Sequence, residues 1–350
     1  MTDCAIPVTV PNGSAMRGIK PRIGGLMLGA VIITALVLSP AARRASDHFG
    51  VFGEGHGLAR LAPQSLSAAF SRTIELPRIE SATSLSQMLA AAGYHLERVR
   101  DGAAEVPRLL VNALPGDLKA LDSSEERKAV FIQTMLPLIL QANEDIAADR
   151  ARVLDLRDRQ AAGQPISVRD QAWLADLYAS YDVPLGNAAE LLRRLDVVPV
   201  SLALAQAALE SGWGTSRFAQ EGNALFGQIG PQGSGDPTLL KSAADGTLFR
   251  SFDSLMGAVR SYVRNLNTHS AYKEFRVARA SIRKTSGEAH TLSGLKLAGA
   301  LKLYSERGDH YLDDLRNLIR ANKLQQLDNS RLVGSSTADA APTISRQPNA

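Results

Sequence analysis

The stretch that decides the fold is Leu209-Glu210-Ser211-Gly212-Trp213-Gly214, followed closely by Asn223-Ala224-Leu225-Phe226-Gly227. Upstream of it, residues 200–210 form an apolar, alanine-rich run whose composition favours a helix. Pro199 stands where a first-turn proline would, and Gly212 stands just past the expected end. The sequence therefore predicts a core helix that carries a glutamate at its carboxyl end.

That glutamate, Glu210, has the setting of a general acid. It faces the negative end of the helix dipole, which disfavours the ionised carboxylate. Partial burial against Trp213 would act in the same direction and raise the pKa of the carboxyl. A carboxyl that keeps its proton near neutral pH can donate it to a leaving group. The residues alone leave a second interpretation open, and favour it: a solvated last-turn glutamate before glycines that cap the helix.

The two motifs together resemble the signature of the bacterial glucosaminidase domain, glycoside hydrolase family 73. The wider stretch from Leu191 to Phe226 resembles its Bax-type branch, and the resemblance extends over residues 118–324. It implies a mainly α (α+β) lysozyme-like fold with a small β-hairpin lobe beside the cleft. It also implies cleavage of the β-1,4 bond after N-acetylglucosamine in peptidoglycan, with Glu210 as the general acid.

We expect four regions along the chain. They are a signal peptide or signal anchor at 1–45, a linker and N-terminal extension at 46–117, the glucosaminidase domain at 118–327, and a disordered tail at 328–350. Glycine, serine and alanine dominate the linker up to residue 77, and short helical and extended patterns follow it. The tail is rich in serine, threonine, alanine and proline, which is typical of disorder.

Within the domain the pattern is mostly helical. A capping box at Ser123-Ser124-Glu125-Glu126 begins a helix in which Pro137 predicts a kink, and a separate charged helix is expected at 146–159. After Gly227 the chain becomes turn-rich, and residues 247–252 alternate with period two. This change predicts the β-hairpin lobe.

The segment Gly24–Leu38 is apolar and has basic residues on both sides. It is shorter than the roughly 20 apolar residues of a membrane span. It fits the core of a signal peptide, with Ser39-Pro40-Ala41 as a cleavage site, although the proline leaves an uncleaved anchor open. Both outcomes predict export, to the periplasm or to the outer face of the inner membrane. An uncleaved segment would make the membrane a partner.

The charge balance argues against a nucleic-acid partner. Five basic residues and one acidic residue fall within the first 45 positions, and the remainder holds 34 of each sign. The six histidines show no zinc-ligand spacing, and there is no glycine-rich phosphate loop, so neither a metal nor another cofactor is expected. The single cysteine, Cys4, cannot form an intrachain disulfide. The expected partner is therefore the peptidoglycan glycan strand that the resemblance implies.

Further site residues are expected around Glu210. Asn223 carries amide groups suited to an acetamido sugar, and Ser211 could either contact substrate or cap the turn. The stretch 303–311 resembles the closing motif of the family, which carries tyrosines. The remaining candidates to line the cleft are Trp213, Phe226, Tyr304 and Tyr311.

A second carboxylate usually assists the acid in glycoside hydrolysis. The expected hairpin lobe offers Asp236 and Asp245, both in turn-like sequences where aspartate is common for local reasons. A distant carboxylate or the acetamido group of the substrate could replace them. Two alternatives to the glucosaminidase therefore stay open: a lytic transglycosylase that uses one glutamate, and a non-catalytic module that binds the cell wall.

Overall fold

The computed structural model describes residues 73–230 and 239–335, which are mainly helical. The helices are α2 (Ala82–Ala91), α3 (Leu96–Arg100), α4 (Ser124–Ala161), α5 (Val168–Ser180), α6 (Ala188–Arg194), α7 (Val200–Ser211), α8 (Arg217–Gly222), α9 (Leu255–Thr268), α10 (Lys273–Ser286), α11 (Gly294–Leu297) and α12 (Asp309–Ala321). The 3-10 helices are η1 (Leu118–Ala120), η2 (Ser270–Tyr272), η3 (Ala298–Tyr304) and η4 (Leu324–Leu327). The strands are β1 (Ile74–Leu76), β2 (Leu109–Val111), β3 (Leu239–Lys241) and β4 (Leu248–Arg250).

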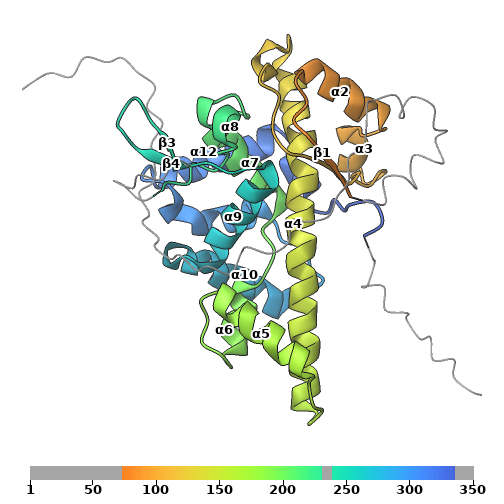
Figure 1. Ribbon diagram of the computed structural model, residues 1–350, viewed down its shortest axis with the longest axis vertical. Helices are drawn as coiled ribbons and strands as arrows, with labels where there is room; N and C mark the ends of the chain where they lie inside the picture. Colours follow the sequence, from red (N-terminus) through yellow and green to blue (C-terminus); the bar gives the residue numbers. More distant parts are fainter. Residues whose placement is uncertain (1–72, 231–238, 336–350) are drawn as a thin grey trace, which may run out of the picture.

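Helix α4 is long and runs along the long axis of the molecule in Figure 1. The hydroxyl of Ser123 accepts hydrogen bonds from the amides of Glu125 and Glu126, at 3.2 and 3.3 Å, and so caps the first turn as predicted. The prediction of a separate helix at 146–159 was wrong, because α4 includes that segment in one helix of 38 residues that also contains Pro137. Pro137 is buried in an apolar stretch of the helix, and we attribute the continuity to packing that offsets the roughly 3 kcal/mol cost of an internal proline.

Helix α7 lies at the centre of the fold and carries Glu210. Its residues 200–208 are all buried, and it packs against α4, α11, α12 and η4. Gly212 ends it in the left-handed conformation, with φ of 59°, as the sequence predicted. Pro199 provides no side-chain cap at the start. The carboxylate of Asp328 takes that role instead, because it accepts a hydrogen bond from the Ser201 amide at 2.8 Å.

The N-terminal extension shares the main core. Strands β1 and β2 pair in parallel, and Leu85, Leu89 and Val111 belong to the same buried cluster as the residues of α7. The expected domain start at residue 118 therefore falls inside one packed unit. The C-terminal boundary also differs from expectation, because Leu332 is buried and pairs with Val106. The predicted disordered tail is thus wrong for residues 328–335, and its remainder lies outside the described residues.

The predicted β-hairpin lobe is confirmed. Strands β3 and β4 are antiparallel, with Leu239 opposite Arg250 and Lys241 opposite Leu248. Phe249 of β4 packs against Phe218 of α8, with ring centroids 4.5 Å apart. This contact holds the hairpin beside α8, above the carboxyl end of α7 (Figure 1).

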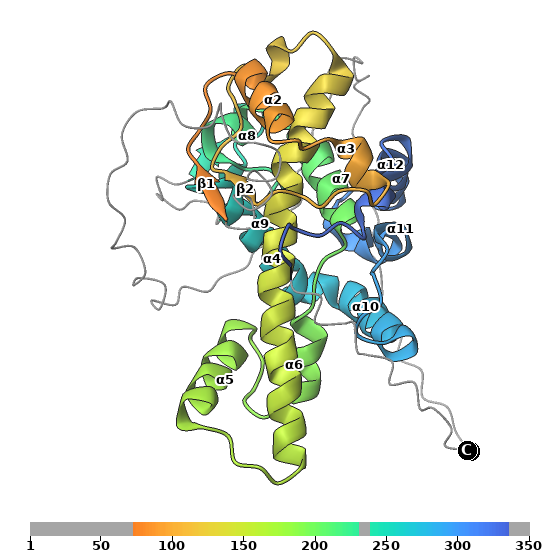
Figure 2. The same ribbon diagram turned by 90° about the vertical axis from the view of Figure 1, so that its right-hand side faces the viewer.

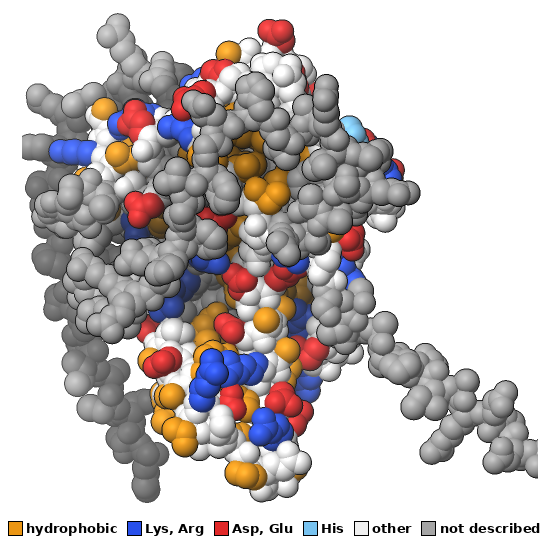
Figure 3. Space-filling view, turned by 45° about the vertical axis from the view of Figure 1, so that its right-hand side comes forward, with side chains coloured by type: hydrophobic (Ala, Val, Ile, Leu, Met, Phe, Trp, Pro, Cys, Tyr) orange, Lys and Arg blue, Asp and Glu red, His pale blue; other side chains and the backbone are white. Residues whose placement is uncertain are grey.

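Helices α5 and α6 form a second layer beside the lower half of α4 (Figure 2). They pack around a separate small core that includes Val153, Tyr178 and Leu191. On the face in Figure 3, acidic and basic side chains are interspersed over this part. None of the helices in the described ranges is long and apolar enough to cross a membrane. The expected signal segment lies outside those ranges.

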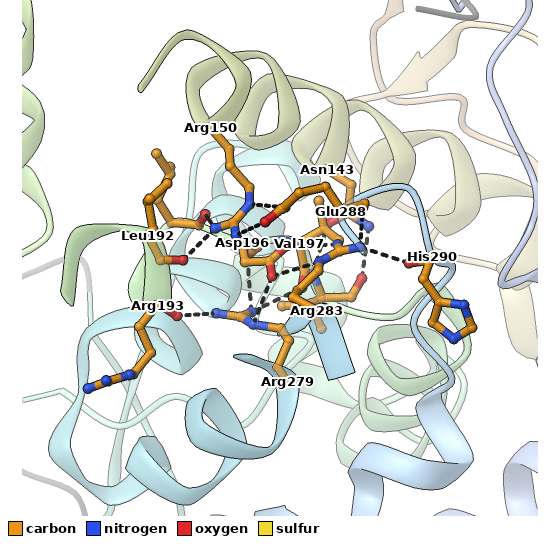
Figure 4. Close-up of polar contacts among 12 residues, drawn as sticks. Asn143, Arg150, Leu192, Arg193, Asp196, Val197, Arg279, Arg283, Glu288 and His290 are labelled. Carbon is orange, nitrogen blue, oxygen red and sulfur yellow. Dashed lines mark hydrogen bonds and ion pairs between the residues drawn. The ribbon is translucent and has the colours of Figure 1, made fainter. Parts of the chain in front are cut away.

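A buried ion network joins α10 to α6 and to the loop between α6 and α7 (Figure 4). Two nitrogens of Arg283 donate to the carboxylate of Asp196 at 2.9 and 3.1 Å. The fully buried Arg279 donates to the backbone carbonyls of Asp196 and Val197, each at 3.0 Å. Burial alone would raise the pKa of Asp196, but the charges of Arg279 and Arg283 outweigh it and lower the pKa. The network therefore fixes the loop that leads into α7.

Candidate active site

Local structure explains which residue types occupy the turn after Glu210. Gly212, Trp213 and Gly214 all have positive φ, at 59°, 58° and 75°, and this run reverses the chain sharply. A Cβ at Gly214 would lie 3.0 Å from the ring of Phe131, so only glycine fits. The Ser211 hydroxyl donates to the carbonyl of Ala207 at 2.5 Å and accepts from the Gly214 amide at 2.8 Å.

Ser211 is fully buried by these contacts. Of the two roles that the sequence left open for it, these hydrogen bonds support the cap of the turn, and a contact with substrate stays a prediction. That turn projects Glu210 from the end of α7, where the residue is partly exposed.

The carboxyl of Glu210 lies against the backbone of a second glycine. Gly227 has φ of 61°, and a Cβ there would be 2.9 Å from Oε2 of Glu210. The two sequence motifs thus meet in space, because the second one supplies the backbone that closes over the acid of the first. A side chain at position 227 would displace the carboxyl.

The carboxyl of Glu210 favours its protonated form. Burial raises its pKa from 4.5 to about 7, against a hydrogen bond from Tyr311 and the positive charge of Arg307, which both lower it. The residue as a whole is partly exposed, yet the desolvation of its carboxyl is the largest effect on its pKa. The prediction of a raised pKa is confirmed.

The predicted burial of Glu210 against Trp213 stays a prediction. The Trp213 ring meets Phe131 edge-on, with centroids 5.7 Å apart, and the ammonium of Lys128 lies 5.7 Å from the centroid of Trp213. Tyr311 and Arg307 also act on the pKa of Glu210, and both lower it. Trp213 therefore belongs to the wall between α7 and α4, and its contact with substrate stays a prediction.

Four buried tyrosines surround the acid: Tyr262, Tyr272, Tyr304 and Tyr311. Burial is the main cause that raises the pKa of each phenol, and the charge of Glu210 raises all four further. Their hydroxyls therefore stay protonated at neutral pH. The rings of Tyr304 and Tyr311 stack with centroids 5.6 Å apart, and Tyr272 lies 5.8 Å from Tyr304. The closing motif thus supplies half of this wall.

Three of the residues expected to bind substrate lie in the layer behind the surface. Phe226 is buried and stacks on Tyr262, with centroids 4.0 Å apart. The hydroxyl of Tyr304 donates to the Phe226 carbonyl at 3.0 Å. The side-chain amide of Asn223 donates to the carbonyl of Phe252 at 2.9 Å and so ties α8 to the hairpin. These contacts give Phe226, Tyr304 and Asn223 a supporting role in the site, and their contact with substrate stays a prediction.

The expected second carboxylates do not meet Glu210 in the described part of the chain. Asp236 lies outside it. Asp245 sits in the hairpin turn, where its carboxylate accepts from the Thr247 amide at 3.1 Å. This hydrogen bond and others from the turn lower its pKa, as expected of a local turn residue. The described residues also hold no group of histidine, cysteine and acidic side chains suited to a metal ion.

Sequence reasoning missed Gln206, Tyr262 and Arg307. Gln206 is fully buried one turn before Glu210. A signal for it was present, because a glutamine in an alanine-rich core helix needs hydrogen-bond partners inside the protein. Tyr262 and Arg307 gave no such signal, since their proximity to Glu210 arises only in the folded chain.

Comparison with known proteins agrees with the geometry. Residues 186–324 match the glucosaminidase family model, described as mannosyl-glycoprotein endo-beta-N-acetylglucosaminidase. The chain is 34% identical to Protein bax of Escherichia coli (strain K12) over 232 residues, which is 64% of this chain and 77% of that protein. It also aligns with the crystal structure of the catalytic domain of the autolysin Auto from Listeria monocytogenes, at 20% identity and a TM-score of 0.27, over 50% of this chain and 96% of that one.

The family match extends from before α7, which carries Glu210, to beyond α12, which carries Tyr311. The identity to Protein bax extends further, over most of both proteins. The chain therefore belongs to the glucosaminidase family of glycoside hydrolases, in its Bax-type branch, and has the lysozyme-like fold of that family.

Proposed function

We propose that this protein is a peptidoglycan hydrolase that cleaves the β-1,4 bond after N-acetylglucosamine, with Glu210 as the general acid. Family membership supports the bond type and the cell-wall glycan. The observation that carries the proposal is the state of Glu210, whose pKa burial raises to about 7 at the floor of the site. The carboxyl can then hold its proton near neutral pH.

In the proposed reaction Glu210 gives its proton to the glycosidic oxygen as the bond to the sugar breaks. The carboxylate that remains is stabilised by the hydrogen bond from Tyr311 and by the charge of Arg307. Both interactions favour the ionised form, so they strengthen as the proton leaves and lower the barrier. The neighbouring phenols stay neutral and add no opposing charge.

The remaining step needs a nucleophile, and no acidic group of the described residues shifts the pKa of Glu210. We therefore expect the acetamido oxygen of the substrate to attack the anomeric carbon. Water then opens the resulting ring and returns a proton to Glu210. A lytic transglycosylase is the second candidate, favoured by the same observation, because it uses one glutamate and the 6-hydroxyl of the muramyl sugar.

Product analysis distinguishes these reactions. Purified peptidoglycan is treated with the wild type, with Glu210→Gln and with Glu221→Gln, which changes an exposed glutamate of α8. We expect fragments that end in reducing N-acetylglucosamine from the wild type and from Glu221→Gln. A loss of about 10²–10⁴-fold is expected from Glu210→Gln. Fragments with anhydro-muramyl ends would establish the transglycosylase reaction. Glycan that is bound but not cleaved would establish a module that only binds the cell wall.

We further propose that the protein acts outside the cytoplasmic membrane, where its substrate lies. The support is the apolar segment Gly24–Leu38 of the sequence, with its basic flanks. A reporter fused after Ala350 should therefore be found outside the cytoplasm. Cytoplasmic reporter activity would contradict the proposal, and the size of the mature protein separates a cleaved signal from an anchor.

A further inference from the structure

Gln206 links two tyrosines of the site from inside the core. The hydroxyl of Tyr262 on α9 donates to its Oε1 at 2.6 Å. Its Nε2 donates to the hydroxyl oxygen of Tyr311 on α12 at 3.0 Å. Gln206 itself is fully buried on α7, four residues before Glu210. One side chain thus ties three helices together directly behind the acid.

The directions of these hydrogen bonds follow from chemistry. An amide oxygen can only accept and an amide nitrogen can only donate, whereas a phenol can do both. The two lengths agree with this assignment, because O–H···O bonds are typically about 0.2 Å shorter than N–H···O bonds. Tyr262 therefore uses its single proton on Gln206, and the oxygen of Tyr311 receives a proton from Gln206.

Tyr311 then has its own proton left to give. The amide nitrogen of Gln206 cannot accept that proton, so the hydroxyl of Tyr311 must donate it to an acceptor other than Gln206. The carboxylate of Glu210 accepts it. We propose that Gln206 is a positioning residue that, through Tyr311, directs a hydrogen bond onto Glu210. This inference rests on the proposed role of Glu210 as the acid.

The contribution of Gln206 to catalysis is indirect. Donation to the oxygen of Tyr311 polarises its O–H group, and hydrogen bonds in such a chain strengthen one another. A stronger donor stabilises the carboxylate that forms when Glu210 gives up its proton. Two of the neighbouring phenols cannot replace it, because Tyr262 donates its proton to Gln206 and Tyr304 donates its proton to the Phe226 carbonyl. Arg307 acts on Glu210 through its charge.

The test replaces Gln206 by methionine, which keeps the length of the side chain and removes both hydrogen bonds. Leu204→Met is the matched control, because Leu204 is buried on the same helix and keeps its apolar character. We expect kcat of Gln206→Met to fall about tenfold with KM nearly unchanged, as for loss of a transition-state interaction. The pH at which activity falls on the alkaline side should rise, because the pKa of Glu210 rises when its hydrogen bond weakens.

A direct titration separates this inference from the proposed function. The carboxyl of Glu210 is followed by carbon-13 NMR in the full chain, and its pKa should be higher in Gln206→Met than in the wild type and Leu204→Met. An unchanged titration curve overturns the inference, whether or not the protein cleaves glycan. Activity of Glu210→Gln equal to the wild type overturns the proposed function instead.

A second pair of variants applies if Gln206→Met does not fold. Tyr262→Phe removes the donor to Oε1 of Gln206. Tyr94→Phe is its control, because the buried Tyr94 hydroxyl has no hydrogen-bond partner among the described residues. We expect the pKa of Glu210 to rise in Tyr262→Phe and to stay at the wild-type value in Tyr94→Phe. Equal titration curves in the two variants overturn the inference.

Discussion

The carboxylate of Asp328 holds both the amide and the hydroxyl of Ser201, at 2.8 and 2.9 Å, and so caps the first turn of α7 from the far end of the chain. The same carboxylate also accepts from the Gly294 amide at 3.2 Å, where α11 begins. A residue 127 positions away thus satisfies amides at the start of the helix that carries Glu210. We infer that the end of the described chain stabilises the site.

Replacement of Asp328 by alanine should lower the stability of the whole domain. Loss of a helix cap typically costs about 0.5–2 kcal/mol, and here a buried amide is also left without its partner. Urea unfolding of Asp328→Ala should therefore show a lower midpoint with an unchanged slope. Asp313→Ala is the control, since Asp313 is exposed and only forms a surface ion pair with Arg316. Equal midpoints for the two variants would exclude the capping role.

Replacement of Gly227 by alanine should damage activity beyond its cost in stability. The new Cβ would lie 2.9 Å from Oε2 of Glu210, so the carboxyl has to move. Gly93→Ala is the matched control, because Gly93 also has positive φ but has no atom within 4 Å of an added Cβ. Both variants should lose about 1–2 kcal/mol from the strained backbone. Only Gly227→Ala should lose most of its kcat, and equal kcat values in the two would contradict the contact.

How far the sequence predicts this site depends on the range of the interactions. The turn after Glu210 follows from local chemistry, so Gly212 and the end of α7 could be predicted. The raised pKa of Glu210 was also predicted, but its neighbours were not, because Tyr311 and Arg307 lie about 100 residues away in sequence. Short motifs identify the acid, whereas tertiary packing determines which groups lie beside it and shift its pKa.

The same distinction explains the errors in the fold. A separate helix was expected at 146–159, after the kink predicted at Pro137, but α4 is continuous through both and is buried around Pro137. Phe226 and Tyr304 looked like platforms for sugar because aromatic side chains suit both cleft and core. Only the folded chain shows that Phe226 stacks on Tyr262 and that Tyr304 donates a hydrogen bond to the Phe226 carbonyl. Likewise the composition of residues 328–335 is that of a tail, although Asp328 and Leu332 are anchored by distant partners.

The alkaline side of the pH–activity profile should report Glu210. Activity requires its protonated form, so kcat/KM should fall above about pH 7, where the pKa of its carboxyl lies. Arg307→Gln removes a charge that lowers this pKa, so the fall should move to higher pH. Lys302→Gln is the control, because Lys302 is exposed and pairs with Asp309 on the surface. A profile of Arg307→Gln that coincides with the control would show that Arg307 does not act on the acid.

The stability of the domain should depend on Asp196 in a pH-dependent way. The folded pKa of Asp196 lies below its ordinary value, so its contribution is present above about pH 4 and is lost as the pH falls through the folded pKa. Removal of one partner from a buried ion pair typically costs about 3–5 kcal/mol. Asp196→Asn should therefore unfold at lower denaturant concentration at pH 7, and the difference from the wild type should shrink below pH 4. Asp158→Asn, which changes an exposed ion pair, should show no such pattern.

The hairpin aspartates should not behave like the acid. Asp245 is exposed and its carboxylate is held by the Thr247 amide, so Asp245→Asn should keep most of the activity of the wild type. We expect the same of Asp236→Asn, because its sequence Gly235-Asp236-Pro237 is that of a turn. Turnover of both variants is compared with that of Glu210→Gln, with binding of glycan measured in parallel. If either aspartate variant binds glycan yet loses as much turnover as Glu210→Gln, a carboxylate of the hairpin activates water, and the acetamido route is wrong.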